Sequence, residues 1–249
     1  MQKKGQKKER LEKILANLGY GVRKDVTYWV RAGWVTINGV PAKSASQKVL
    51  ASEVMLEGKP LDHPYGLTLV YHKPVGAVCS RKEEGRLIYD DFPERWKDRK
   101  PALSSVGRLD KDTSGLLILT DDGLLNHQIT SPKKHVSRTY RVELAEPLSG
   151  EEVASFASGC LMLDAENTPC LPAELTIESE HMATMVLHEG RYHQVRRMFG
   201  ALGNRVVALQ RTHIGQLSLA MMNVDAGCYE SMSSEALLQK IHGEDVAEA

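Results

Sequence analysis

The sequence lacks the long apolar runs, clustered cysteines and glycine-rich phosphate loops that identify several large protein classes. No apolar run approaches the roughly 18–20 residues that cross a bilayer, so we expect no membrane contact. The four cysteines are far apart, without a Cys-x-x-Cys pair, which predicts reduced thiols in a cytoplasmic protein and no zinc site; a single disulfide is left open. The Lys-rich segment 1–10 has no apolar stretch and is not typical of a secretory signal. Nucleotide cofactors also lack support, because no glycine-rich loop opens a helix.

Net charge is missing as well, but the two signs are unevenly distributed. Residues 1–48 hold 11 of the 32 Lys and Arg residues and only 3 of the 32 Asp and Glu residues. The start of the chain is therefore basic, and the remainder is acidic to the same extent. This asymmetry favours a basic module that binds a polyanion, joined to a body with a different task. Residues 1–8 are expected to form a disordered basic tail.

Residues 9–58 are expected to form a small domain of two helices and a hairpin. Apolar residues recur at helical spacing from Leu11 to Leu18, which predicts a helix that ends at Gly19. A second helix is expected over about 24–32. A strand at 34–37 follows it, with an Asn-Gly hairpin turn after the strand.

The order of these elements resembles an S4-type RNA-binding domain over about residues 9–56. The resemblance implies that the helix pair and hairpin bind RNA phosphates and RNA shape, since A-form RNA hides its major-groove base edges. A generic helix–helix–hairpin domain with solvated charges is the alternative. The basic candidates for the RNA contact are Arg10, Arg23, Lys24 and Arg31.

A larger domain is expected to follow the small one. Two prolines and two glycines fall within residues 57–66, so we place a linker at 59–66, the larger domain at 67–242 and a frayed acidic tail at 243–249. Strands interleaved with few helices indicate an α+β fold around a mixed or antiparallel sheet. Strands are expected near 67–73, 116–119, 139–144, 173–177, 183–188, 206–211 and 215–219, and helices near 123–129, 150–158 and 193–202.

One polar, glycine-flanked segment, residues 107–123, carries the strongest chemical signal. It places the carboxylate of Asp110 just before the apolar run 116–119, which is typical of a buried strand. The segment resembles the catalytic motif of pseudouridine synthases of the RsuA type, in which this Asp is essential. The alternatives are that Asp110 only caps a turn, or that the nearby Asp112 is the reactive carboxylate. The end of the segment, 121–123, is interpreted as a turn and helix cap.

Two further motifs support the resemblance and imply partners for Asp110. Residues 137–140 contain Tyr140 where the family has an aromatic residue against the target base. Residues 189–199 contain Arg196 where the family has the basic residue that pairs with the catalytic Asp.

Three other positions complete the predicted site. The segment 211–217 is an expected strand lining the site, with Leu217 packed nearby. Arg108, two residues before the catalytic motif's Asp, is a candidate for substrate binding. Residues 73–76 match a family signature of less certain role.

The resemblance implies that uridine loses its N1–C1′ bond, rotates its base and rejoins the sugar through C5. No redox step occurs, so neither a cofactor nor a metal is needed. Asp110 attacks C1′, as in retaining glycosidases, or acts as a base in a glycal route, and the sequence leaves both routes open. His188 and His193 are five residues apart and do not form a His-Glu-x-x-His zinc motif, so we expect no metal site.

The substrate is expected to be ribosomal RNA. Residues 120–123 and 127–132 most resemble family members that modify a 16S ribosomal RNA uridine of the uridine 516 type. We expect a monomeric cytoplasmic enzyme that acts on rRNA in a pre-ribosomal small-subunit particle. Modification of 23S rRNA is the first alternative. A non-catalytic RNA-binding ribosome-assembly factor would have a broken Asp–Tyr–Arg set, and a glycoside or nucleoside hydrolase would lack the basic module.

Overall fold

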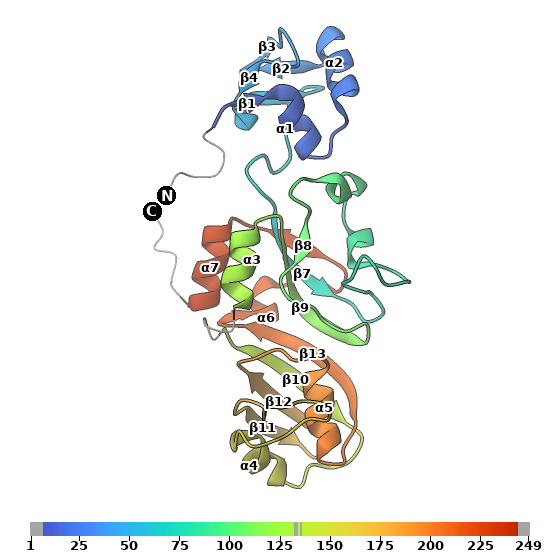
Figure 1. Cartoon of the computed structure of the whole chain (residues 1–249), viewed down its shortest axis with the longest axis vertical. Helices are drawn as coiled ribbons and strands as arrows, with labels where there is room; N and C mark the ends of the chain where they lie inside the picture. The colour runs from blue at the N-terminus through green and yellow to red at the C-terminus, as the bar shows by residue number, and fades with distance from the viewer. Residues whose placement is uncertain (1–6, 132–133, 135, 244–249) are drawn as a thin grey trace. The chain divides into compact units, whose positions relative to one another are not determined.

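The structure is a computed structural model that describes residues 7–131, 134 and 136–243 (Figure 1). The described chain forms two compact units. The first contains the chain up to Thr68 together with Phe92–Ser104 and Leu119–Gly123, and the second contains the rest. The tails expected at 1–8 and 243–249 lie almost entirely outside the described residues.

The N-terminal part of the first unit has the two helices and the hairpin that the sequence predicts. Leu11, Leu15 and Val26 are fully buried and hold both helices against a small sheet. That sheet has the strand order β3-β2-β5-β6, while β1 pairs with β4. The elements are β1 (Glu9–Arg10), α1 (Leu11–Asn17), α2 (Arg23–Arg31), β2 (Val35–Ile37), β3 (Val40–Pro41), β4 (Lys48–Val49), a 3₁₀ turn (Ala51–Glu53), β5 (Val54–Leu56) and β6 (Lys59–Pro60).

The predicted linker begins too early, because its first residues belong to the small sheet. Lys59 and Pro60 form β6, which pairs with β5. Glu57 and Gly58 connect the two strands with φ values of 51° and 75°, the left-handed geometry of a tight two-residue hairpin. Glycine and proline signalled a break in the chain here, but the same residues suit a hairpin turn and an edge strand.

Two later segments complete the first unit through polar contacts. Trp96 Nε1 donates to the Asp62 carboxylate at 2.8 Å, and Arg95 pairs with the same carboxylate. Arg99, only 3% exposed, forms an ion pair of 2.8 Å with the buried Asp121. The sequence predicts only a turn and helix cap at Asp121. In the structure its carboxylate also neutralises the buried Arg99.

The second unit is built on a mixed sheet, which confirms the predicted α+β class. The strand order is β11-β12-β10-β13-β9-β7-β15, with β14 beside β13 and β8 beside β9. β13 and β9 are parallel, whereas β10 is antiparallel to both β12 and β13. The elements are β7 (Thr68–Lys73), a 3₁₀ turn (Ile88–Asp91), β8 (Ser104–Ser105), β9 (Thr113–Thr120), α3 (Gly123–Thr130), β10 (Arg138–Leu144), α4 (Glu151–Ala157), β11 (Glu174–Ser179), β12 (Met182–Leu187), α5 (Gln194–Ala201), β13 (Val206–Ile214), β14 (Leu217–Ser218), α6 (Leu219–Met222), β15 (Tyr229–Ser231) and α7 (Ser234–His242). A further 3₁₀ turn (Glu94–Asp98) belongs to the first unit.

Two hydrophobic clusters cover this sheet. One joins β10, β11, β12 and β13 to α4 and α5, with Phe156 and Phe199 in edge-to-face contact at 5.0 Å between ring centroids. The other joins β7 and β9 to α3 and α7, which lie side by side in Figure 1.

The helix α7 is absent from the sequence-based prediction. Only Leu237 and Ile241 are fully buried on it, so its apolar pattern is short. Its termini are nevertheless well defined. The Ser233 hydroxyl accepts a hydrogen bond from Ala236 N at 3.1 Å, and Gly243 ends the helix in the left-handed conformation.

Candidate active site

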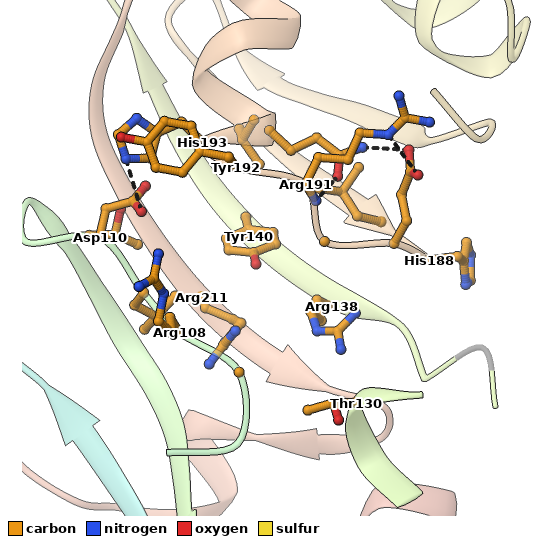
Figure 2. A pocket seen from close by; sticks show the side chains of 18 of the residues that line it. Arg108, Asp110, Thr130, Arg138, Tyr140, His188, Arg191, Tyr192, His193 and Arg211 are labelled. Atoms are coloured by element: carbon orange, nitrogen blue, oxygen red, sulfur yellow. Dashed lines mark hydrogen bonds and ion pairs between the residues drawn. The ribbon is translucent and has the colours of Figure 1, made fainter. Parts of the chain in front are cut away.

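A cavity of about 450 Å³ lies within the second unit (Figure 2). Its walls come from the loop 107–113, the end of α3, the inward faces of β10 and β13, and the segment 187–195 before and into α5. Asp110 and Tyr140 both line it, so the structure brings together two of the three residues in the expected Asp–Tyr–Arg set. The volume is in the range of small-molecule sites, which suits one nucleotide better than a duplex.

A β-bulge aims two of the lining side chains. Along the pair of β10 and β13, Thr139 lies opposite His213 but Tyr140 lies opposite Arg211, so Thr212 is the extra residue. Without this bulge Tyr140 would face Thr212 and Arg211 would point to the other side of the sheet. The bulge therefore places an aromatic ring and a guanidinium on the same face of the sheet, where both line the cavity.

Gly115 permits the close approach of β9 and β13 beside the cavity. It pairs with Arg211 and has φ of +111°. A Cβ at this position would lie 2.2 Å from the Arg211 carbonyl oxygen. Arg211 Nε in turn donates to the Leu116 carbonyl at 2.8 Å. The glycine thus fixes the position of the buried arginine in the cavity wall.

Lys73, the last residue of β7, holds the loop that carries Asp110 through hydrogen bonds to backbone carbonyls. The Lys73 ammonium is fully buried and donates to the carbonyls of Thr113 at 2.8 Å, Pro74 at 3.0 Å and Lys111 at 3.4 Å. Burial lowers the pKa of Lys73, and the negative groups around it, Asp110 among them, oppose that shift. The segment of less certain role in the sequence therefore supports the Asp110 loop.

Replacing Lys73 with Met tests this support. Met keeps the apolar stem but leaves buried carbonyls without a donor, so we expect a loss of about 1–3 kcal/mol in unfolding free energy. We also expect turnover to fall at least tenfold, because a small misplacement of a catalytic group is costly. Thermal melts and turnover measure the two effects. Lys111→Met is the control, since the Lys111 side chain is exposed and only its carbonyl accepts from Lys73; equal losses in both variants would contradict the supporting role.

The side chain that contacts Asp110 is His193, the residue before α5. His193 Nε2 lies 3.3 Å from Asp110 Oδ1, and the Asp110 side chain is 30% exposed. His193 has φ of 48°, a left-handed conformation that is uncommon for a residue with a side chain. Tyr192 stacks on the His193 ring at 3.8 Å between ring centroids and is 66% exposed (Figure 2).

The expected ion pair between Arg196 and Asp110 is wrong for this structure. Arg196 pairs with Asp112 at 3.0 Å and also donates to the Asp112 and Val206 carbonyls. The physical reason is position. Arg196 is the third residue of α5, and from there its side chain reaches Val206 on β13 and Asp112 in the loop that carries Asp110. Arg196 is not among the residues that line the cavity. Asp112 is therefore a structural partner of Arg196, and His193 occupies the position expected of Arg196.

The turn before α5 is fixed by a polar network. Arg191 pairs with the Glu189 carboxylate at 3.0 Å, and Gln194 Nε2 donates to the same carboxylate at 2.7 Å. The Gln194 side-chain oxygen accepts from Arg191 N at 2.9 Å. The motif 189–199 is rich in polar residues although α5 packs into the core. The network accounts for this, because the polar residues before the helix fix the turn that carries His193.

The remaining candidate residues fall into three groups. Arg108 lines the cavity with a side chain that is 61% exposed and lies 3.8 Å from Glu83. Leu217 is fully buried in the α3–α7 cluster and is not a lining residue; it packs in the same cluster as Ile129 and Val136, which do line the cavity. The basic residues of the first unit are solvent-facing, with Arg10 and Arg23 near Glu12 and with Lys24 and Arg31 exposed.

Sequence reasoning does not place Arg138, Arg211 or His193 in the site, although all three line the cavity. All three lie inside motifs that were recognised, but only the fold shows which neighbours point the same way. The sequence suggests only a zinc-ligand role for His193, and its spacing from His188 argues against that role. Among the described residues, no group of three or more His, Cys, Asp or Glu side chains is arranged to hold a metal ion, and no helix is long and apolar enough to cross a membrane. The four cysteines are free thiols.

The chain is similar to known RNA pseudouridine synthases over most of its length. Residues 67–201 match the family model of the RNA pseudouridylate synthases, and residues 9–54 match the S4 domain. A ribosomal small subunit pseudouridine synthase A of Pasteurella multocida is 42% identical over 92% of this chain and 97% of its own length. An uncharacterized RNA pseudouridine synthase of Bacillus subtilis is 38% identical over 92% of this chain and 96% of its own. A crystal structure of a pseudouridylate synthase, 38% identical, covers 94% of this chain and 99% of its own with a TM-score of 0.64.

Proposed function

The chain belongs to the RNA pseudouridylate synthase family, and we propose that it isomerises one uridine of 16S ribosomal RNA, of the uridine 516 type, with Asp110 as the reacting carboxylate. The observation that carries the proposal is the joint presence of Asp110 and Tyr140 in one nucleotide-sized cavity. The S4 domain supplies an RNA-binding module in the same chain.

Two routes use the same carboxylate. In the first, Asp110 attacks C1′ and the N1–C1′ bond breaks; the uracil rotates, C5 bonds to C1′ and Asp110 is released. In the second, Asp110 removes the C2′ proton as the N1–C1′ bond breaks, which leaves a glycal and the uracil anion; C5 then bonds to C1′ and Asp110 returns the proton to C2′. In both, the proton on C5 is finally lost and N1 gains one, so that the product is an isomer of the substrate. Both need an ionised carboxylate close to the sugar.

Tyr140 fits the task of receiving the uracil. The target uridine must leave its stack, at a cost of a few kcal/mol, and an aromatic face offsets part of that cost. The ring lies on β10 in the middle of the cavity, between Asp110 and Arg138 (Figure 2). Asp110 at the rim and Tyr140 in the wall would hold the sugar and the base of one nucleotide respectively.

The relatives favour 16S rRNA as the substrate. Several that match over most of their length are named ribosomal small subunit pseudouridine synthase A, including those of Pasteurella multocida and Vibrio cholerae. We extend that target to this chain, as a monomer acting in the cytoplasm on a pre-ribosomal small-subunit particle. The motif segments 120–123 and 127–132 were the sequence signal for the same subgroup.

The experiment compares the two large rRNAs. Purified protein is incubated with 16S and with 23S rRNA transcripts carrying C5-tritiated uridine, and tritium release is measured together with the position of each new pseudouridine. The 16S transcript is tested both free and bound by small-subunit ribosomal proteins, and we expect one modified site in 16S rRNA in at least one of the two forms. A single site in 23S rRNA would keep the chemistry and overturn the target.

The S4 domain gives a separate prediction about binding. Lys24 and Arg31 are exposed on α2, and changing both to Gln should weaken RNA binding and reduce the slope of log affinity against log salt by about 1.4–1.8. Filter binding at several salt concentrations measures the slope. The control is the double variant Arg141→Gln with Arg205→Gln, which removes two exposed charges from the second unit. An unchanged slope in the α2 variant would show that this face does not contact phosphates.

A further inference from the structure

The cavity contains more positive charge than its own residues neutralise. Its lining has two acidic side chains, Asp110 and Glu189, against four arginines. Glu189 pairs with Arg191, and Asp110 lies 3.3 Å from the His193 ring. Two arginines of the lining, Arg138 on β10 and Arg211 on β13, have no carboxylate partner among the described residues. A nucleotide-sized pocket with two uncompensated guanidinium groups favours an anionic ligand.

Arg211 is the more informative of the two. It is 2% exposed, yet one of its terminal nitrogens, Nη2, has no hydrogen-bond partner among the described residues. Nε is the nitrogen that holds the side chain, through the Leu116 carbonyl at 2.8 Å. Buried donors normally have acceptors, because a donor without one has lost its hydrogen bonds to water and gained none in the protein. An unmet donor in the wall of a cavity indicates an acceptor that the ligand brings.

Arg138 lies beside Arg211 on the neighbouring strand. Residues 138 and 140 point to one face of β10, and the bulge brings Arg211 to that face opposite Tyr140. Burial lowers the pKa of Arg138, and the positive charge of Arg211 lowers it further, which places the two guanidinium groups within electrostatic reach. Figure 2 shows both below Tyr140, with Arg211 on the side toward Arg108. Two like charges stay together in a half-buried site at an energetic cost that an anion between them would remove.

From this arrangement we infer that Arg138 and Arg211 form a binding site for the phosphate group attached to the target nucleotide's sugar. The inference rests on the proposed function, since a uridine in RNA brings a phosphodiester on each side of its ribose and no other anion. The arginine pair would hold the backbone while Tyr140 holds the base and Asp110 acts on C1′. The three contacts together fix the orientation of the sugar before its glycosidic bond breaks.

The test compares nucleotides that differ only in phosphate. Binding of uridine, uridine 5′-monophosphate and uridine 3′-monophosphate to the full-length protein is measured by calorimetry. We expect at least one monophosphate to bind about tenfold to hundredfold more tightly than uridine, the advantage of charge-assisted hydrogen bonds to one phosphate. The preferred isomer identifies which of the two phosphodiesters the pair holds.

Arg138→Gln should remove most of that advantage while leaving uridine binding unchanged. Arg138→Lys should restore part of it, because lysine keeps the charge but not the planar fork. The matched control is Arg141→Gln, which makes the same change on the same strand; Arg141 lies 3.7 Å from Glu178 and does not line the cavity. Arg211→Lys, checked by thermal melting, repeats the test on the second arginine where that variant remains folded.

An RNA version of the experiment separates this inference from the proposed function. A substrate with one neutral methylphosphonate next to the target uridine should be turned over about tenfold or more slowly by the wild type, with no additional loss in Arg138→Gln. If the wild type binds uridine and its monophosphates with equal affinity, and Arg138→Gln does the same, the arginine site is overturned even though pseudouridine is formed. A phosphate preference lost in Arg138→Gln, without pseudouridine in any rRNA, would keep the site and overturn the proposed target.

Discussion

Asp110→Asn is expected to reduce pseudouridine formation by about 10⁴-fold or more while RNA affinity stays within a few-fold. Asparagine has nearly the same shape, so the loop and the cavity should keep their structure. It is neither a nucleophile for C1′ nor a base for a sugar proton, so both routes stop at the first step. Tritium release from C5-tritiated RNA measures turnover, and filter binding of the same RNA measures affinity.

The control for this variant is Asp112→Asn, two residues further along the same loop. Asp112 is 63% exposed and pairs with Arg196 at 3.0 Å. Its loss removes one contact of the loop, so we expect a turnover change of about tenfold or less, within the range of other surface ion pairs. Turnover that is retained in Asp110→Asn and abolished in Asp112→Asn would transfer the reacting role to Asp112.

Gly115→Ala is expected to have the second-largest effect, this time on the fold of the site. The new Cβ would lie 2.2 Å from the Arg211 carbonyl oxygen and 2.7 Å from its amide nitrogen, both backbone atoms that cannot rotate away. The φ of +111° is also unfavourable for any residue with a side chain. Relief requires β9 to separate from β13, and we expect a loss of about 4 kcal/mol or more in unfolding free energy. Chemical denaturation measures it.

Gly200→Ala is the matched control, because it adds the same methyl group to an open position. Gly200 lies in α5, and no neighbouring atom would lie within 4 Å of a Cβ there. Alanine in a helix is favoured over glycine, so we expect a gain of about 0.4–1 kcal/mol. A similar small effect at both positions would mean that β9 and β13 do not approach as closely as the structure indicates.

The sequence was sufficient for the elements with strong local patterns. The helix from Leu11, the Asn38-Gly39 hairpin and the apolar strand at 116–119 follow from helical spacing, turn chemistry and an uninterrupted apolar run, and all three are present. Elements with weak local patterns, such as β6 and α7, are not predicted: β6 has two residues, and α7 buries only Leu237 and Ile241. Their existence depends on pairing and packing with distant segments.

The chemistry of the site was only partly predictable for the same reason. A motif gives the residue type and the order, so Asp110 and Tyr140 were found and share a cavity. Side-chain direction depends on the bulge at Thr212 and on the left-handed backbone of His193, neither of which has a sequence signature. The pairing of Asp110 with His193 in place of Arg196, and the unmatched charge of Arg211, therefore required the fold.

The measurement that tests the central claim most directly is a pseudouridine map of 16S and 23S rRNA from cells that lack the gene for this chain. The same cells are examined after rescue with the wild type and with Asp110→Asn. The account predicts the loss of one 16S pseudouridine, restored by the wild type and not by Asp110→Asn. Restoration of that pseudouridine by Asp110→Asn, or an rRNA map unchanged by removal of the gene, would contradict it.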